Sequence, residues 1–288
     1  MGTLIVTDSC YDLPLSFLEA HQIPVIGLTF TLNGKEYADD QGKSLDLRSF
    51  YNAIRQGATP TTSQVNTEEF LQFFKKYLDR GQDILYIAFS SALSGTYNSA
   101  RIARDMLKSD YPDRTVTVVD SLCASMGQGL LVYKAVQLQR QGYSHEELVR
   151  WVEDNKLKIN HWFTVDDLNH LKRGGRLSGT SALIGTILDI KPVLHVNDEG
   201  RLIPVEKVKG RKKSLRRLVE MLEQRIVDPE EQVVFISHGD ALEDAQFTAD
   251  LIRSKVQVKD ILINTIGPII GSHAGPDTIA VFFFSSSR

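Results

Sequence analysis

Residues 83–105, DILYIAFSSALSGTYNSARIARD, constrain the fold of this chain more than any other stretch. Residues 83–89 form a short apolar run that is typical of a buried strand. Small hydroxyl residues and a glycine follow at once, and from Tyr97 the pattern predicts a helix. A strand that leads through such a loop into a helix gathers free N–H groups and hydroxyls, where α/β proteins usually hold an anion. The simpler interpretation is that Ser94 caps the helix and Gly95 permits the turn.

The order of strand, small-residue loop and helix recurs through the first half of the chain. We expect strands at residues 3–6, 24–32, 83–89 and 115–119, and helices at residues 47–54, 70–78 and 130–138. Asn33-Gly34 signals a hairpin after the second of these strands, and Ser44 fits the cap of the first of these helices. Such alternation predicts a mainly parallel sheet that is covered by helices on both faces.

The pattern changes near residue 157, beyond which hairpins mix with helices. We expect strands at residues 160–165, 190–196, 202–208, 233–237, 261–265 and 279–284, and helices at residues 215–222 and 241–252. Asp198-Glu199-Gly200 predicts a hairpin turn, and before the change Ser144 and Glu147 predict a capping box. The sequence thus predicts an α/β fold with two domains. Residues 1–157 carry the parallel sheet, and residues 158–288 form a smaller domain with a mixed sheet and a basic face.

Composition narrows the class of protein. Of 288 residues, 42% are hydrophobic and 24% are charged, as in an ordinary soluble globular protein, and the net charge of −3 gives no sign of a nucleic-acid partner. The two cysteines, Cys10 and Cys123, cannot make a disulfide framework or a Cys-based zinc site. Without a signal-peptide pattern or a long apolar run, we expect a cytoplasmic protein.

The common catalytic and nucleotide motifs are absent from the sequence. Neither a Walker A loop nor a G-x-G-x-x-G loop is present, and Ala92 and Thr96 stand where a nucleophile elbow at Ser94 needs glycines. His238-Gly239-Asp240 could hold a metal with Glu243 or Asp244, but a strand end with a helix cap at Asp240 explains it more economically. We therefore expect neither a metal nor a cofactor.

Four loops that are rich in small hydrogen-bond donors remain. They are residues 61–63, 90–96, 121–129 and 271–275. In a parallel sheet such loops gather at the carboxyl edge. Donors without an acidic partner suit the binding of an anion better than chemistry on it.

Basic residues form a second group. They are Lys172, Arg173 and Arg176 in one loop, and Lys207, Lys209, Arg211, Lys212, Lys213, Arg216 and Arg217 around a later helix start. They form either a solvated charged face or a docking surface for an acidic partner protein or for the face of a membrane.

The order of several short motifs along the chain resembles the DegV family of fatty-acid-binding proteins, from Leu4 to Phe284. The motifs are Thr7-Asp8-Ser9, Thr62-Ser63-Gln64, SSALSGTY at residues 90–97, Asp120-Ser121, LKRGGRLS at residues 171–178, Lys191-Pro192, Gly267-Pro268, and His273 with Gly275-Pro276.

The resemblance implies a two-domain α/β fold shared with the dihydroxyacetone-kinase substrate subunit. It implies that a long-chain fatty acid lies buried between sheet and helices, with its carboxylate at the carboxyl edge of the first domain. It also implies a chain that is not itself an enzyme but carries the lipid for a separate ATP-dependent fatty acid kinase. That kinase would phosphorylate the carboxylate, and the acyl phosphate would enter phospholipid synthesis.

Site residues carry over from the same resemblance. Thr62 and Ser94 match the carboxylate ligands, with His273 close by, and Arg173 and Arg211 match basic positions for the phosphorylated head group or for kinase docking. Hydroxyl donors can hold a carboxyl group without a buried cation. Tail contacts are expected from the apolar residues Leu28, Phe30, Leu130, Ile184 and Leu188.

Two features depart from the family pattern. Asp277 replaces the usual glycine, which would place a negative charge near the head group. Cys10 and Cys123 occupy loop positions more often held by Thr, Ser or Ala.

Two other functions stay open from the residues alone. One is an enzyme, either a polyol phosphotransfer subunit or a serine hydrolase that uses Ser94 and His273, with Asp277 as the nearest residue to orient the histidine. The other is a lipid-sensing regulator that uses the basic face on a partner.

Overall fold

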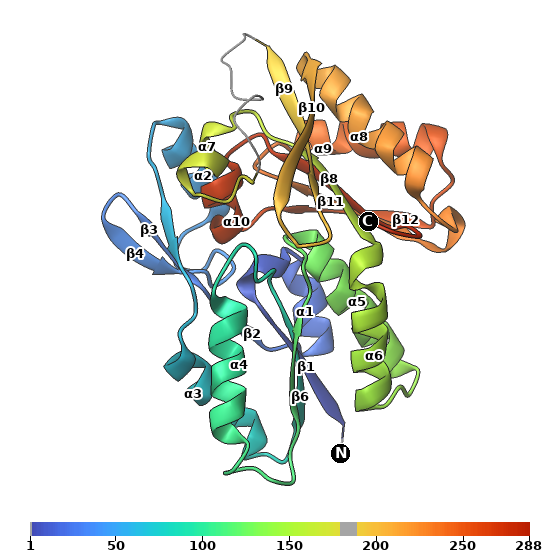
Figure 1. Cartoon of the computed structure of the whole chain (residues 1–288). Coiled ribbons are helices and arrows are strands. Elements are labelled where there is room, and N and C mark those ends of the chain that lie inside the picture. Colours follow the sequence, from blue (N-terminus) through green and yellow to red (C-terminus); the bar gives the residue numbers. More distant parts are fainter. Residues whose placement is uncertain (1, 179–188) are drawn as a thin grey trace.

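A computed structural model describes residues 2–178 and 189–288, and its first sheet lies in the N-terminal half (Figure 1). The strand order is β2-β1-β6-β7, with bounds Val25–Ile26, Thr3–Asp8, Asp83–Ala88 and Val116–Asp120. All pairs are parallel. The apolar run of β6 is buried on both faces, as the central strand of a covered parallel sheet requires.

Helices cover this sheet on both faces. They are α1 (Leu15–His21), α3 (Thr67–Leu78), α4 (Thr96–Leu107), α5 (Met126–Arg140) and α6 (His145–Asn155). The α3 and α4 helices pack together on one face, and α5 and α6 on the other (Figure 1). The predicted capping box of Ser144 and Glu147 begins α6.

The second sheet is mixed and lies in the C-terminal half. Its order is β10-β9-β8-β13-β11-β12, with bounds Leu202–Lys209, Ile190–Val196, Ile159–Thr164, Ile279–Phe284, Val233–His238 and Asp260–Thr265. Among the described strands of this second sheet, only β11 and β12 pair in parallel, and β9 and β10 form the predicted hairpin. The predicted α/β fold with a parallel and a mixed sheet is confirmed, whereas the domain boundary at residue 157 stays a prediction.

The two faces of the mixed sheet have different partners. On β13, Ile279, Val281 and Phe283 belong to the apolar cluster under α8 (Arg211–Arg225) and α9 (Leu242–Lys255). Side chains alternate along a strand, so Ala280 and Phe282 face the other way, toward the N-terminal half.

A small third sheet, β4-β3-β5, contains Lys35–Ala38, Thr29–Leu32 and Thr61–Ser63. The prediction of one strand over residues 24–32 was therefore wrong. The chain bends at Gly27, where a Cβ would lie 3.0 Å from the Asp39 carbonyl oxygen, so only glycine lets the two backbones approach. The predicted cap of α2 (Leu47–Arg55) was also wrong, because Asp46 accepts from the Ser49 N–H while Ser44 bonds Asp40.

Three short helices and three 3-10 turns complete the described chain. They are α2, α7 (Asn169–Arg173) and α10 (Pro268–Ala274), with 3-10 turns at Ser9–Tyr11, Lys156–Lys158 and Pro229–Glu231. The α10 helix contacts α2, α7, β3 and β5, so it joins the two halves (Figure 1). No helix of the described residues is long and apolar enough to span a bilayer.

Candidate functional site

A cavity of about 410 Å³, the inner cavity, lies between the two halves of the molecule. The face of the mixed sheet that is turned toward the N-terminal half forms its floor through His161, Phe163, Val196, Ser237, Ala280 and Phe282. Loops at the carboxyl edge of the parallel sheet line the cavity on the side opposite this floor. The α10 helix borders the cavity with Ile269, Ile270 and His273. The size and the largely apolar lining are those of a pocket for an apolar small molecule.

Three predicted residues belong to this lining, and two of them are in contact. Thr62 on β5, Ser94 before α4 and His273 on α10 all line the inner cavity. The Thr62 Oγ1 and His273 Nε2 atoms are 2.8 Å apart, and the Ser94 hydroxyl lies 2.9 Å from the Thr96 hydroxyl. Ser94 also accepts from the Thr96 N–H at 3.3 Å, although Gly95 is the N-cap of the helix.

His273 is held as a neutral imidazole. Burial, with a further contribution from Arg176, lowers its pKa to about 4. Its Nδ1 atom is buried without a partner, and a Cβ at Gly174 would come within 2.1 Å of that atom. Since a buried N–H without an acceptor is costly, we place the proton on Nε2, where it is donated to Thr62. The hydroxyl proton of Thr62 is then free to point into the cavity.

Arg176 is a site residue that the sequence analysis missed. It lines the inner cavity, and it donates from Nε to the Leu93 carbonyl at 3.1 Å and from Nη1 to the Gly174 carbonyl at 2.5 Å. A cation therefore borders the three polar groups, contrary to the expectation of hydroxyl donors alone. No local signal in the sequence distinguishes it from Lys172 and Arg173 in the same loop.

A second cavity of about 360 Å³, the outer pocket, adjoins the first. The two share Thr62, Arg176 and His273, so these residues form the wall between them. Arg173 lies in the outer pocket, where its Nη2 atom is 3.0 Å from His170 Nδ1. The outer pocket is polar and basic where the inner cavity is apolar.

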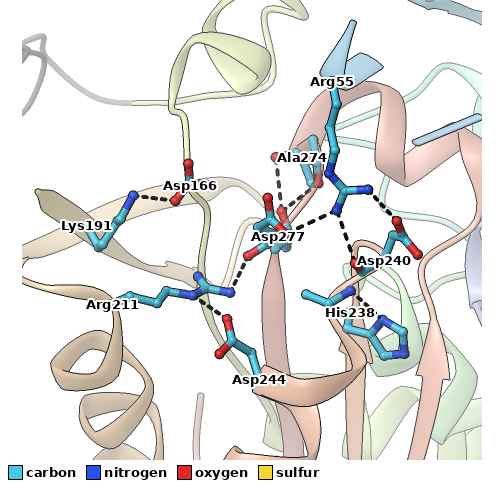
Figure 2. Close-up of polar contacts among 12 residues, drawn as sticks. Arg55, Asp166, Lys191, Arg211, His238, Asp240, Asp244, Ala274 and Asp277 are labelled. Carbon is cyan, nitrogen blue, oxygen red and sulfur yellow. Dashed lines mark hydrogen bonds and ion pairs between the residues drawn. The ribbon is translucent and has the colours of Figure 1, made fainter. Parts of the chain in front are cut away.

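Neither Arg211 nor Asp277 lines either cavity. Figure 2 shows both residues among their polar partners. The Arg211 Nε atom is 2.7 Å from Asp244 Oδ2, and its Nη2 donates to the Asp277 carbonyl at 2.5 Å. The Asp277 carboxylate faces Arg55 Nη2 at 3.2 Å. The Asp277 carboxylate was expected near the lipid head group, but it pairs with Arg55 outside the cavities. Asp277 therefore also does not orient His273, as a serine hydrolase would need.

Asp240 was expected to cap a helix, and that prediction was wrong. Ala241 is the N-cap of α9, and no side chain caps it. The Asp240 carboxylate instead pairs with Arg55, which also donates to the Asp240 carbonyl at 3.1 Å (Figure 2). Over residues 2–178 and 189–288, no three His, Cys, Asp or Glu side chains are grouped so that they could hold a metal.

Two buried carboxyl groups beside the start of α10 were also missed. Asp12 accepts from the Ser125 hydroxyl at 2.5 Å and from the Gly267 N–H at 2.8 Å, and burial raises its pKa to about 7. Burial raises the pKa of Asp39 to about 8, with a contribution from Asp12. Sequence could not reveal them, because each becomes buried only when distant segments meet.

The five residues that were expected to contact the acyl tail have three different outcomes. Leu28 lines the inner cavity. Phe30 and Leu130 are buried but are not in its lining. Ile184 and Leu188 lie outside the described residues.

A family model and a known relative both match this chain over nearly its whole length. The family model named DegV, described as an uncharacterised protein family, matches residues 3–286. A DegV domain-containing protein of Clostridium perfringens is 52% identical over 285 residues, 99% of this chain and 98% of that protein.

Solved structures with the same fold include two that are named for lipid binding. A DegV lipid-binding protein of Thermotoga maritima has a TM-score of 0.88 at 30% identity, with 100% of both chains covered. DegV of Bacillus subtilis, a fatty-acid-binding protein, has a TM-score of 0.85 at 31% identity, with 99% of this chain and 100% of that chain covered.

Proposed function

Since this chain belongs to the DegV family, we propose that it binds a long-chain fatty acid in the inner cavity. The observation that carries the proposal is a largely apolar cavity whose lining includes the polar side chains of Thr62, Ser94 and His273, which we call the donor cluster. The relatives of Thermotoga maritima and Bacillus subtilis that bind lipid or fatty acid support it.

The donor cluster would hold the carboxylate. Thr62 would donate its hydroxyl proton to one oxygen, because His273 Nε2 already donates to the Thr62 oxygen. Ser94 would donate to the other oxygen, and the Arg176 guanidinium would add a favourable electrostatic field. A neutral His273 keeps this arrangement constant above its pKa of about 4.

The acyl tail would supply most of the affinity. Each buried CH₂ contributes about 0.8 kcal/mol, so a palmitoyl chain gains on the order of 10 kcal/mol before the cost of association is subtracted. Phe89, Leu93, Ile269 and Phe282 line its path.

We propose that the protein acts in the cytoplasm as a lipid carrier for a separate ATP-dependent fatty acid kinase. The outer pocket supports this role, because it reaches the residues that would hold the carboxylate and carries Arg173 at its rim. The acyl phosphate formed there would enter phospholipid synthesis, with transient contact at a membrane surface. Arg211 would act at the docking face through its position at the first residue of α8.

Native mass spectrometry tests the binding proposal. Protein incubated with oleate or palmitate should show the mass of one bound fatty acid, and the Thr62→Ala/Ser94→Ala variant should lose it. A Thr115→Ala/Ser254→Ala variant is the matched control, since both of its positions are exposed and outside the cavities. Wild-type protein that stays empty would contradict the proposal.

The carrier role has a separate test with a bacterial fatty acid kinase and ATP. Oleate on this protein should give an acyl phosphate that hydroxylamine traps as a hydroxamate, and Arg173→Ala should slow the reaction at unchanged oleate binding. Equal product from free oleate without this protein would contradict the carrier role.

A further inference from the structure

The floor of the inner cavity contains a buried polar side chain away from the donor cluster. Ser237 on β11 is fully buried and lines the cavity, in a strand whose other buried residues before it are Val234, Phe235 and Ile236. A serine at this place in an apolar floor needs either a structural partner or a ligand partner.

Its partner in the protein is Ser125, which also lines the cavity. The two hydroxyl oxygens are 3.0 Å apart, and the Ser125 hydroxyl is 2.5 Å from Asp12 Oδ2. Ser125 has φ of 52° and ψ of −140°, a backbone conformation that is unfavourable for an L-residue. Strained backbone of this kind gathers at ligand sites.

The hydroxyl protons of Ser125 and Ser237 leave this pair able to hydrogen-bond to a ligand. With Asp12 ionised, Ser125 donates its one O–H group to that carboxylate, so its oxygen can only accept from other groups. Among the described contacts Ser237 has only Ser125 as a partner, so its proton can turn toward the cavity. The pair therefore offers a ligand one acceptor and one donor.

The pair is connected to the opposite end of α10 from His273. Asp12, which holds Ser125, accepts from Gly267 at the start of α10, whereas His273 stands near the end of that helix. His273 is six residues after Gly267, which is a rise of about 9 Å along the helix at 1.5 Å per residue. A fatty acid held at His273 would pass the serine pair partway along its chain.

We propose that the inner cavity recognises a fatty acid with a mid-chain hydroxyl group, which binds between Ser125 and Ser237. The ligand hydroxyl donates to the Ser125 oxygen and accepts from the Ser237 hydroxyl. A plain acyl chain leaves the pair bonded to itself, and a keto group uses only the donor. This inference rests on the proposed fatty-acid function and specifies its ligand class.

Titration calorimetry with stearate, 10-hydroxystearate and 2-hydroxystearate tests the proposal. Wild-type protein should bind 10-hydroxystearate at least as tightly as stearate, although an unmatched hydroxyl in an apolar cavity would weaken binding. Ser237→Ala should weaken 10-hydroxystearate about tenfold, the factor for one net hydrogen bond, and leave stearate and 2-hydroxystearate within about threefold. Ser237→Cys, which keeps the shape with a weak donor, should give the same selective loss.

Ser214→Ala is the matched control, because Ser214 is equally buried on α8 and does not line the cavity. Wild-type protein that binds stearate but binds 10-hydroxystearate tenfold more weakly would overturn the proposal. So would an equal loss of both lipids in Ser237→Ala, which marks a structural serine. If wild-type protein binds no lipid, the proposed function fails and this inference fails with it.

Discussion

Asp39 carries a buried carboxyl oxygen, Oδ2, that has no hydrogen-bond partner. It lies close to the Asp12 carboxyl, since a Cβ on Gly267 would be 3.0 Å from Asp12 Oδ1 and 3.7 Å from Asp39 Oδ2. Burial and this neighbour raise the Asp39 pKa from 3.8 to about 8, so the folded protein keeps this group protonated at neutral pH.

Asp39→Asn should therefore stabilise the protein in a pH-dependent manner. The folded state binds the Asp39 proton more tightly than the unfolded state, so this contribution is complete below pH 3.8 and is lost as pH rises to about 8. Asparagine has no proton to lose. Urea unfolding should show the variant gaining at least about 2 kcal/mol over wild type between pH 4.5 and 8.

The neighbouring Asp40 supplies the control with the opposite sign. Its pKa is lowered in the folded protein, where Ser44 donates from its hydroxyl and from its backbone N–H. Its stabilising contribution is present above its ordinary pKa and is lost as pH falls. Asp40→Asn should thus lose a little stability at neutral pH, and a pH-independent effect of Asp39→Asn would contradict the burial argument.

At the scale of elements, β13 has one face on the inner cavity and the other in the apolar cluster under α8 and α9. Ala280→Leu would place a larger side chain in the floor of the inner cavity. Stearate affinity should fall at least about tenfold, while the free energy of unfolding should stay level or rise, because filling a cavity is stabilising. Fluorescent fatty-acid displacement and urea unfolding measure the two effects.

Val281→Leu is the control on the opposite face, which packs under α8 and α9. Overpacking there should lower the free energy of unfolding by about 1–3 kcal/mol and leave stearate affinity unchanged. Undiminished stearate binding by Ala280→Leu would show that the lipid does not lie on this floor.

Much of the element pattern was predictable from the sequence, because it depends on local signals. The apolar runs of β6 and β11, the β9–β10 turn and the Ser144 capping box all act within a few residues. The break in residues 24–32 and the role of Asp240 were not predictable, since they depend on Asp39 and Arg55 from other elements.

The candidate site was only partly predictable for the same reason. Motif order placed Thr62, Ser94 and His273 at one lining, but nothing local distinguished Arg176 from its basic neighbours. Ser125 and Ser237 look like turn and strand residues until the two halves meet and bring their hydroxyls together.

At the scale of the whole molecule, Arg288 ties distant segments together. Its guanidinium donates to the carbonyls of Leu122 at 2.8 Å, Lys156 at 2.7 Å and Asn197 at 3.0 Å, and to Cys123 Sγ at 3.1 Å. Burial raises the Cys123 pKa to about 11, and Arg288 opposes that rise. The thiol therefore serves packing rather than reactivity.

Arg288→Met should lower the free energy of unfolding by about 2–4 kcal/mol, because buried carbonyls lose charged donors. Arg253→Met is the control, since Arg253 pairs with Asp250 where both side chains are at least half exposed, and it should cost less than about 1 kcal/mol. Equal effects in urea unfolding would contradict the role of Arg288.

A crystal structure with stearate brominated at its terminal carbon tests the proposed lipid site most directly. The carboxylate should lie within about 2.5–3.2 Å of the Thr62 and Ser94 hydroxyls, and the bromine signal should lie among the apolar residues of the inner cavity. A lipid in the outer pocket, or a carboxylate at Ser125 instead, would contradict the proposed binding mode.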